Sequence, residues 1–428
     1  MAQNNQYELI LLGATGYTGK LVAEWVTKHL PQDLKWAVAG RNTKKLQNVV
    51  NELTQLDPNR KQPDIETCEQ EKEQLLKLAQ KTKLIITTVG PFMWYGEPVL
   101  AACAETGTHY LDCTGEVPWI YNMIEKYHET AKKNGAIIIP ECGLDSVPAD
   151  IMAYSVTKHI RDTLNAPTAN VVMSLYEGKS GFSGGTAQTM IGLFSEFSLA
   201  HLAKAMDPYS LSPVRPTAPS STPKGSLFYR LFGLLNVPEI GGIQTTWLMA
   251  SVDECITHRS WGLYESSAKK TSQPQVGYGP RFRFNEYMRA KSLLEALAIK
   301  FGLGLIGLLL ALPPTRWILS PLLCRFVIPA PGEGPSKESM KNDLMSYRAV
   351  GIADTEKKEK VLAKLDIAHG GYETTGLTLS AAAHVILRGR LEDTEAGRLG
   401  GGILTPATLG DPFVKKLNEF GMKIQAGV

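Results

Sequence analysis

The chain has 428 residues, of which 43% are hydrophobic and 20% are charged. This length exceeds what one ordinary hydrophobic core needs, and the composition is that of a soluble globular protein, so we expect two domains and exclude a disordered chain. The formal net charge of +3 is small, and no dense basic run accompanies it. Nucleic acid is therefore not expected as a partner.

Cysteine and histidine are scattered along the chain. The six cysteines form no C-x-x-C pair, and none of the eight histidines stands at ligand spacing from another. Metal sites need such spacings, so we predict no metal. Unpaired thiols are typical of a reducing compartment. The first residues lack the basic and apolar regions of a secretory signal, and we expect the protein on the cytoplasmic face of the cell.

Over the first 150 residues, short apolar strands alternate with amphipathic helices. The predicted strands are 7–12, 35–39, the neighbourhood of 65, 84–89, 110–113 and 136–139, and the predicted helices include 18–30, 75–78, 97–105 and 121–133. This alternation produces parallel pairing with helices on both faces, so we predict an α/β fold with a Rossmann-type doubly wound parallel sheet. Ligands bind beyond the carboxyl ends of such strands, which here are Gly13, Gly40, Gly90, Thr114 and Gly143.

The loop that joins the first strand to the first helix has the sequence GATGYTG, residues 13–19. Backbone N–H groups at a helix start attract phosphate through their unsatisfied donors and the helix dipole. A purely structural turn is the alternative, but the position between an apolar strand and an amphipathic helix favours a dinucleotide. We predict six cofactor contacts in this loop, from Gly13, Thr15, Gly16, Tyr17, Thr18 and Gly19.

The end of the second strand indicates which nicotinamide cofactor is bound. An NAD site usually places Asp or Glu there, whereas this strand is followed by Arg41 and Asn42. We expect Asn42 to cap the helix that follows. A guanidinium suits a 2′-phosphate, so we predict NADP(H), with a solvated arginine as the alternative. At the end of the fourth strand, Val89, Gly90 and Pro91 form a rigid loop that we expect at the ribose or nicotinamide.

Past residue 150 the strict alternation fades. We expect an NADP-binding domain over 1–150, a second mixed α/β domain over 151–365, and a C-terminal segment, 366–428, that packs back on the core. A glycine- and serine-rich loop, 180–186, is expected either to border the substrate or to be only a turn and helix cap. Further predicted elements are strands 171–176, 247–252 and 281–284, a solvated helix face at 356–364, and helices 372–387 and 413–422.

The most unusual segment is 301–312, twelve residues without a polar side chain, inside a longer apolar region over 293–328. Spanning a bilayer takes about 20 apolar residues. Because Lys300 and the pair Pro313–Pro314 interrupt this region, we predict two shorter arms inserted shallowly into a membrane or a lipid-droplet surface. A buried core helix or a homodimer interface is the alternative. The residues suited to the rim are Arg316, Trp317 and Arg325.

Nine short motifs extend in order over nearly the whole chain. They are GATGYTG at 13–19, AGR at 39–41, VGPF at 89–92, YLDCTGE at 110–116, GLDSVPAD at 143–150, SGGT at 183–186, PGEGPS at 331–336, GGYETTG at 370–376 and GGILTPA at 401–407. In these motifs the chain resembles the saccharopine dehydrogenase-like oxidoreductases, which include bacterial trans-acting enoyl reductases of glycolipid synthesis. The resemblance implies a Rossmann domain, a second α/β domain, NADPH, and links to lipid metabolism, membranes and lipid droplets.

The reacting proton needs a donor, because the nicotinamide supplies only the hydride. An enoyl thioester is protonated at its α-carbon and an imine at its nitrogen. Glu116 and Asp145 follow strand exits and are the predicted acids. Asp145 and Ser146 could instead cap the helix that begins near Pro148.

Three functions remain open from the sequence. The leading hypothesis is an NADPH-dependent reductase of a lipid or polyketide-type enoyl substrate, either a small molecule or linked to an acyl carrier, acting near a membrane. The first alternative is a saccharopine-type imine or amino-acid reductase, for which no cluster of basic residues is evident. The second alternative is a lipid-droplet protein that binds NADPH without turnover.

Overall fold

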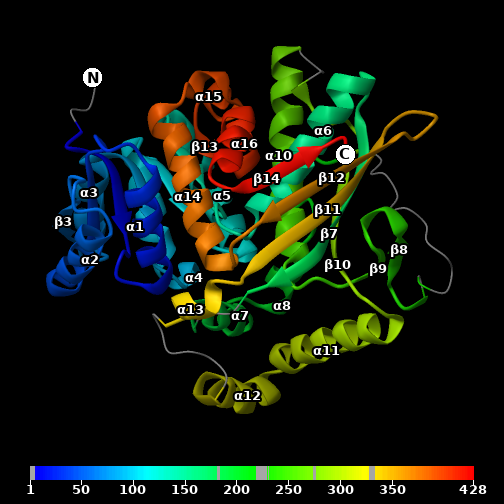
Figure 1. The fold of residues 1–428 in the computed structure, drawn as a ribbon, viewed down its shortest axis with the longest axis horizontal. Helices are drawn as coiled ribbons and strands as arrows, with labels where there is room; N and C mark the ends of the chain where they lie inside the picture. Colours follow the sequence, from blue (N-terminus) through cyan, green and yellow to red (C-terminus); the bar gives the residue numbers. More distant parts are fainter. Residues whose placement is uncertain (1–4, 181–183, 218–228, 230, 273–275, 327–332) are drawn as a thin grey trace.

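Two sheets with helices packed around them make up the body of the molecule, and a pair of helices projects from it (Figure 1). The computed structural model describes residues 5–180, 184–217, 229, 231–272, 276–326 and 333–428. The first sheet lies at the end of the molecule that carries the N-terminus, and the second sheet lies at the opposite end (Figure 1).

The first sheet has seven parallel strands in the order β13-β6-β5-β4-β1-β2-β3. Its strands are β1 (Tyr7–Leu12), β2 (Trp36–Gly40), β3 (Asp64–Thr67), β4 (Thr82–Thr87), β5 (His109–Asp112), β6 (Ile137–Ile139) and β13 (Gly402–Ile403). Apart from β13, this is the order of the dinucleotide-binding fold, which confirms the predicted fold class. The order reverses between β1 and β4, where Leu12 lies between Ala39 and Thr87.

Both faces of this sheet are covered. Leu9 and Leu11 of β1 belong to one buried cluster with the helices α1, α2 and α14, and Ile10 and Leu12 belong to another with α3, α4 and α5. Side chains alternate between the faces of a strand, so a strand covered on both sides must be apolar throughout. The helices are α1 (Tyr17–His29), α2 (Thr43–Leu56), α3 (Lys72–Gln80), α4 (Phe92–Thr106), α5 (Val117–Asn134) and α14 (Gly371–Arg388).

The second sheet is mixed, with the order β14-β12-β11-β7-β10-β9-β8 and one parallel pair, β7 with β10. Its strands are β7 (Thr168–Lys179), β8 (Leu235–Val237), β9 (Gly242–Thr245), β10 (Arg283–Arg289), β11 (Leu344–Ala353), β12 (Lys360–Ile367) and β14 (Met422–Ala426). The helices α6 (Val147–Leu164) and α10 (Ala250–Thr271) pack on one face. The expected boundary at residue 150 falls inside α6, because this helix starts at the exit of β6 and packs against the second sheet.

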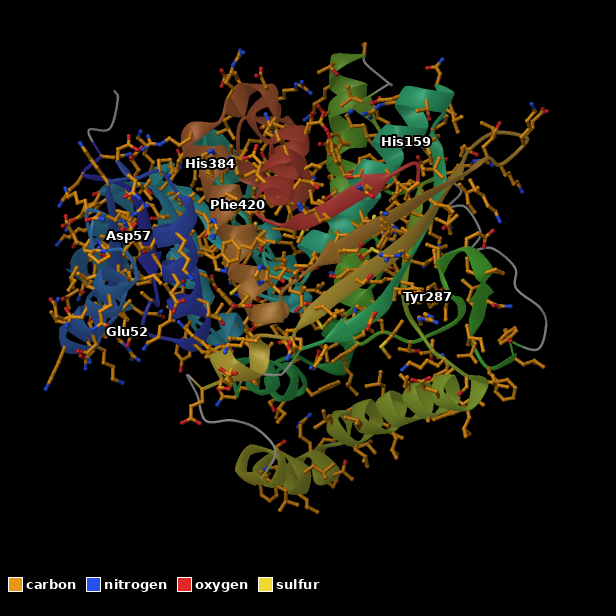
Figure 2. The ribbon with its side chains drawn as sticks, in the orientation of Figure 1. Glu52, Asp57, His159, Tyr287, His384 and Phe420 are labelled. Carbon is orange, nitrogen blue, oxygen red and sulfur yellow. The ribbon has the colours of Figure 1, made fainter. Side chains whose placement is uncertain are left out.

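The C-terminal segment contributes to both halves of the molecule. Its strand β13 joins the first sheet and β14 joins the second, while α14 packs along α1. A Cβ on Gly376 would lie 2.5 Å from the Trp25 ring, so only glycine allows this approach. The ring of Phe420, labelled in Figure 2, lies 5.1 Å from that of His29 on α1. The short helices α15 (Glu395–Leu399) and α16 (Gly410–Glu419) complete the segment.

Several predicted elements differ from those observed. The segment 247–252 is not a strand but leads into α10. The charged segment 356–364 is not a helix face, because residues from Lys360 onward form β12, in which every second side chain is buried. The predicted loop 180–186 includes residues 181–183, which lie outside the described part of the chain.

The apolar region forms two helices, α11 (Leu293–Ala311) and α12 (Pro313–Phe326), here called the arm. The helix α11 continues through Lys300, contrary to the prediction, and ends before Pro313. By length and composition it is the one helix in the described part of the chain that could cross a membrane. Phe301 and Leu305 are 61% and 56% exposed. Figure 1 shows the arm below the body, and Figure 2 shows side chains of the arm projecting away from the body.

Candidate active site

The glycine loop between β1 and α1 leaves no room for side chains at two positions. Gly13 has a φ of +90°, and a Cβ there would lie 2.8 Å from the Val89 side chain. A Cβ on Gly19 would collide with the carbonyl oxygen of Gly13. No side chain caps the first turn of α1. Its N–H groups therefore stay available as donors, and this turn fits a pyrophosphate.

The other predicted residues of this loop surround the same turn. Thr15, Gly16 and Thr18 are all half-buried. The Tyr17 hydroxyl donates to the carbonyl oxygen of Pro335 at 2.7 Å, and the ring meets that of Tyr372 edge to face at 5.2 Å. Segments from the beginning and the last quarter of the chain therefore meet at the loop. Because its hydroxyl is used within the protein, Tyr17 offers a phosphate only its backbone N–H.

Arg41 follows β2 directly and is exposed. The Asn42 side chain accepts a hydrogen bond of 2.9 Å from the backbone N–H of Lys45, which caps α2 as predicted. Lys44 and Lys45 are also exposed in the first turn of α2, and the sequence analysis overlooked them. The strand end thus offers three basic side chains and no carboxylate. This arrangement fits the 2′-phosphate of NADP(H).

The loop after β4 is attached to the glycine loop. The backbone N–H of Thr88 donates to the Leu12 carbonyl at 3.0 Å, and the Thr88 hydroxyl donates to the Gly13 carbonyl at 3.2 Å. The predicted residues follow at once, with Val89 half-buried, Gly90 exposed and Pro91 buried. The place of this loop beside the switch in strand order suits the predicted contact with the ribose or nicotinamide. Thr88 was not identified from the sequence.

Glu116 is fully buried at the exit of β5. One carboxylate oxygen accepts the backbone N–H of Phe92 at 2.9 Å and the hydroxyl of Thr189 at 3.2 Å, and the other accepts the backbone N–H of Met93 at 2.5 Å. Burial raises the pKa of Glu116 to about 7, although all three hydrogen bonds favour the ionised form. The carboxylate predicted to be an acid is therefore surrounded by donors.

Asp145 is half-buried beyond β6, among other carboxyl groups. Burial, together with the nearby Asp253, raises its pKa to about 7. Burial also raises the pKa of Asp253 and of Glu286, and the nearby Asp253 charge raises that of Glu286 further. Ser146 stands at the start of α6, but its hydroxyl donates to Glu141 at 3.2 Å and does not cap the helix, so that interpretation was wrong for Ser146. Neither Asp253 nor Glu286 was identified from the sequence.

Sequence comparisons with known proteins show the family of this chain. Residues 9–139 match the saccharopine dehydrogenase NADP binding domain. A Mycobacterium tuberculosis protein is 32% identical, and the alignment covers 99% of this chain and 98% of that protein. Trans-acting enoyl reductases from Mycobacterium tuberculosis and Mycobacterium ulcerans are 30% and 28% identical, with 97% and 98% of each chain covered. An apo saccharopine dehydrogenase structure from Saccharomyces cerevisiae aligns over 99% of this chain and 100% of its own, at 13% identity and a TM-score of 0.48.

Proposed function

This chain belongs to the saccharopine dehydrogenase-like family of NADP-dependent oxidoreductases, and we propose that it reduces the enoyl group of a lipid substrate at a membrane surface. The names of the mycobacterial relatives support the enoyl group. The exposed apolar arm supports the lipid and the membrane, and it is the observation that carries the proposal.

The chemistry divides between cofactor and protein. NADPH supplies a hydride to the β-carbon, and a proton must reach the α-carbon, so that the double bond becomes single and NADP⁺ is formed. Asp145 is the proposed proton donor. Its position near the β5 and β6 exits and its pKa of about 7 mean that a protonated fraction is present at neutral pH. Asp253 and Glu286 behind it help to keep this proton, because two adjacent buried carboxylates repel each other.

The arm is attached to the body near the start of α11 and near the start of α12. The Thr245 hydroxyl donates to the carbonyl of Ala296 at 2.8 Å, and Arg316 donates to the carbonyl of Phe194 at 2.6 Å. A helix held in this way cannot cross a bilayer without leaving the body. The arm is therefore proposed to lie in the membrane surface with its outer side inserted. Between residues 296 and 332 the chain has three basic residues and no acidic residue, which suits anionic headgroups.

Vesicle flotation tests the membrane contact. The chain should float with vesicles of phosphatidylcholine and phosphatidylglycerol. A double variant, Leu305→Asp with Trp317→Asp, should remain at the bottom, since these side chains are 56% and 87% exposed on the arm. The control is Leu56→Asp, a leucine 38% exposed at the end of α2. Equal flotation of the chain and the double variant would refute the membrane contact.

Oxidation of NADPH tests the reaction. A long-chain trans-2-enoyl thioester presented in vesicles should be reduced faster than a cyclic imine in solution. Asp145→Asn should lower kcat by about 10²- to 10⁴-fold, the range of general acid catalysis, with little change in NADPH affinity. Turnover of the imine alone would favour the saccharopine-type reaction. Tight NADPH binding with no turnover of either compound would favour a binding protein.

A further inference from the structure

We propose that Glu116 is a positioning residue that holds the loop after β4 in place for the nicotinamide end of the cofactor, and that it fastens α7 (Gly184–Glu196) to this loop. The proposal is based on three hydrogen bonds that the buried Glu116 carboxylate accepts. The donors are the backbone N–H groups of Phe92 and Met93 and the hydroxyl of Thr189 on α7. This role is independent of the substrate, since it concerns the cofactor.

The helix α4 needs such a partner at its start. Its first residue, Phe92, follows Pro91, which has no side-chain group to cap the helix. The first N–H groups of a helix have no acceptor within the helix, and leaving a buried N–H unpaired is costly. Glu116 provides the acceptors from a position 24 residues later. Because α4 begins directly after Gly90 and Pro91, fixing its first turn also fixes the predicted nicotinamide loop.

The same carboxylate connects this loop to the second half of the molecule. Thr189 lies on α7, and one turn later a Cβ on Gly192 would collide with the Met93 side chain. Glycine at 192 therefore leaves room beside α7 for the end of the Met93 side chain. The hydroxyl of Thr189 and the backbone of Phe92 donate to the same oxygen of Glu116, so the loop and α7 are held by one group.

Two probes separate the ends of the cofactor site. NADPH contacts both ends, whereas adenosine 2′,5′-bisphosphate lacks the nicotinamide and reports only on the Arg41 end. Glu116→Gln replaces one acceptor oxygen by an amide that faces the N–H groups as a donor. We expect it to weaken NADPH binding by about tenfold, while the affinity for the bisphosphate changes by less than about twofold. Emission of bound NADPH should also move toward that of free NADPH.

The matched control is Glu97→Gln. Glu97 lies on α4, where it pairs with Lys126 at 2.9 Å. Its substitution should leave the affinities for NADPH and for the bisphosphate unchanged. Equal weakening of NADPH and bisphosphate by Glu116→Gln would show a general structural defect and overturn the positioning role. Unchanged NADPH affinity would also overturn it.

A milder variant keeps the test decisive if Glu116→Gln does not fold. Thr189→Val removes only the hydroxyl donor, and we expect it to weaken NADPH binding by about two- to fivefold without affecting the bisphosphate. Its control is Thr163→Val on α6, whose hydroxyl donates within its own helix to His159 at 2.7 Å. Thr189→Val with NADPH affinity equal to that control would contradict the connection through α7. Failure of the unaltered chain to reduce any lipid would leave these results intact and would count only against the proposed substrate.

Discussion

The strand β1 and the helix α11 are both strongly apolar, yet they have opposite surroundings. In β1, Leu9, Ile10 and Leu11 are fully buried between neighbouring strands and two layers of helices. In α11, large side chains such as Phe301 and Leu305 are mostly exposed. Apolar composition therefore indicates that a segment is more stable out of water. Whether it is buried in the core of the chain or left exposed for another surface depends on the elements around it.

The largest expected difference between these segments concerns stability. Leu11→Asp places a carboxylate in a closed apolar core and should cost at least about 4 kcal/mol, enough to unfold the body. Leu305→Asp on the arm should change the free energy of unfolding by no more than about 0.5 kcal/mol. Thermal denaturation followed by circular dichroism measures both. Similar losses for the two variants would mean that the arm is packed in solution.

Glycines sharpen the same comparison. A methyl group on Gly19 would meet the backbone of Gly13, so Gly19→Ala should weaken NADPH binding by about 30- to 100-fold, or about 2–3 kcal/mol. No atom lies within 4 Å of a Cβ built on Gly302 in α11. Gly302→Ala should therefore leave NADPH binding unchanged and favour the helix by about 0.5–1 kcal/mol. Fluorescence titration and thermal denaturation check the pair, and normal NADPH affinity in Gly19→Ala would contradict the loop assignment.

Arg41→Ala tests the adenosine end of the cofactor site. Loss of the guanidinium should weaken NADPH binding by about 1–3 kcal/mol, the scale of charge-assisted hydrogen bonds. The affinity for NADH, which has no 2′-phosphate, should change little. Parallel titrations with the two cofactors measure the difference. Equal losses for NADPH and NADH would argue against a 2′-phosphate at this strand end.

The smallest expected effect is a pH dependence of stability, which comes from carboxyl groups buried inside the body. Five carboxyl groups there have pKa values raised to about 6 or 7, mainly by burial: Asp112, Glu116, Asp145, Asp150 and Asp253. A raised pKa means that the folded state binds more protons than the unfolded state, so stability falls as pH rises through these values. Histidines whose pKa values are lowered mainly by burial, among them His109, His128 and His258, oppose this trend mainly below about pH 6.5.

We therefore expect Tm to fall by roughly 2–5 °C between pH 6.5 and pH 8. In the folded chain the Ala407 N–H donates to the Asp150 carboxylate at 2.8 Å. Asp150→Asn should reduce the fall of Tm with pH, because the amide oxygen can still accept this hydrogen bond but the amide does not ionise. Glu356→Gln, at an exposed glutamate between β11 and β12, is the control. A Tm that rises over this interval would show that the sign is wrong.

How far the sequence predicts the structure differs between elements. The cap at Asn42 was predicted correctly, because capping is a contact between residues three positions apart. The start of α4 was placed at residue 97 instead of Phe92, because the acceptor for its first turn comes from Glu116 in another loop. The strand β12 was interpreted as a helix face, since its lysines suggested solvent and its alternation was overlooked.

The sequence by itself determined the parallel sheet, the glycine loop and the NADP(H) preference, because these depend on strand, turn and helix signals within a few tens of residues. Only the tertiary structure decided that Tyr17 is held by Pro335, that Glu116 joins α4 to α7, and that the arm remains outside the body. These contacts join positions far apart in the chain, and local patterns of hydrophobicity carry no information on which distant groups will meet.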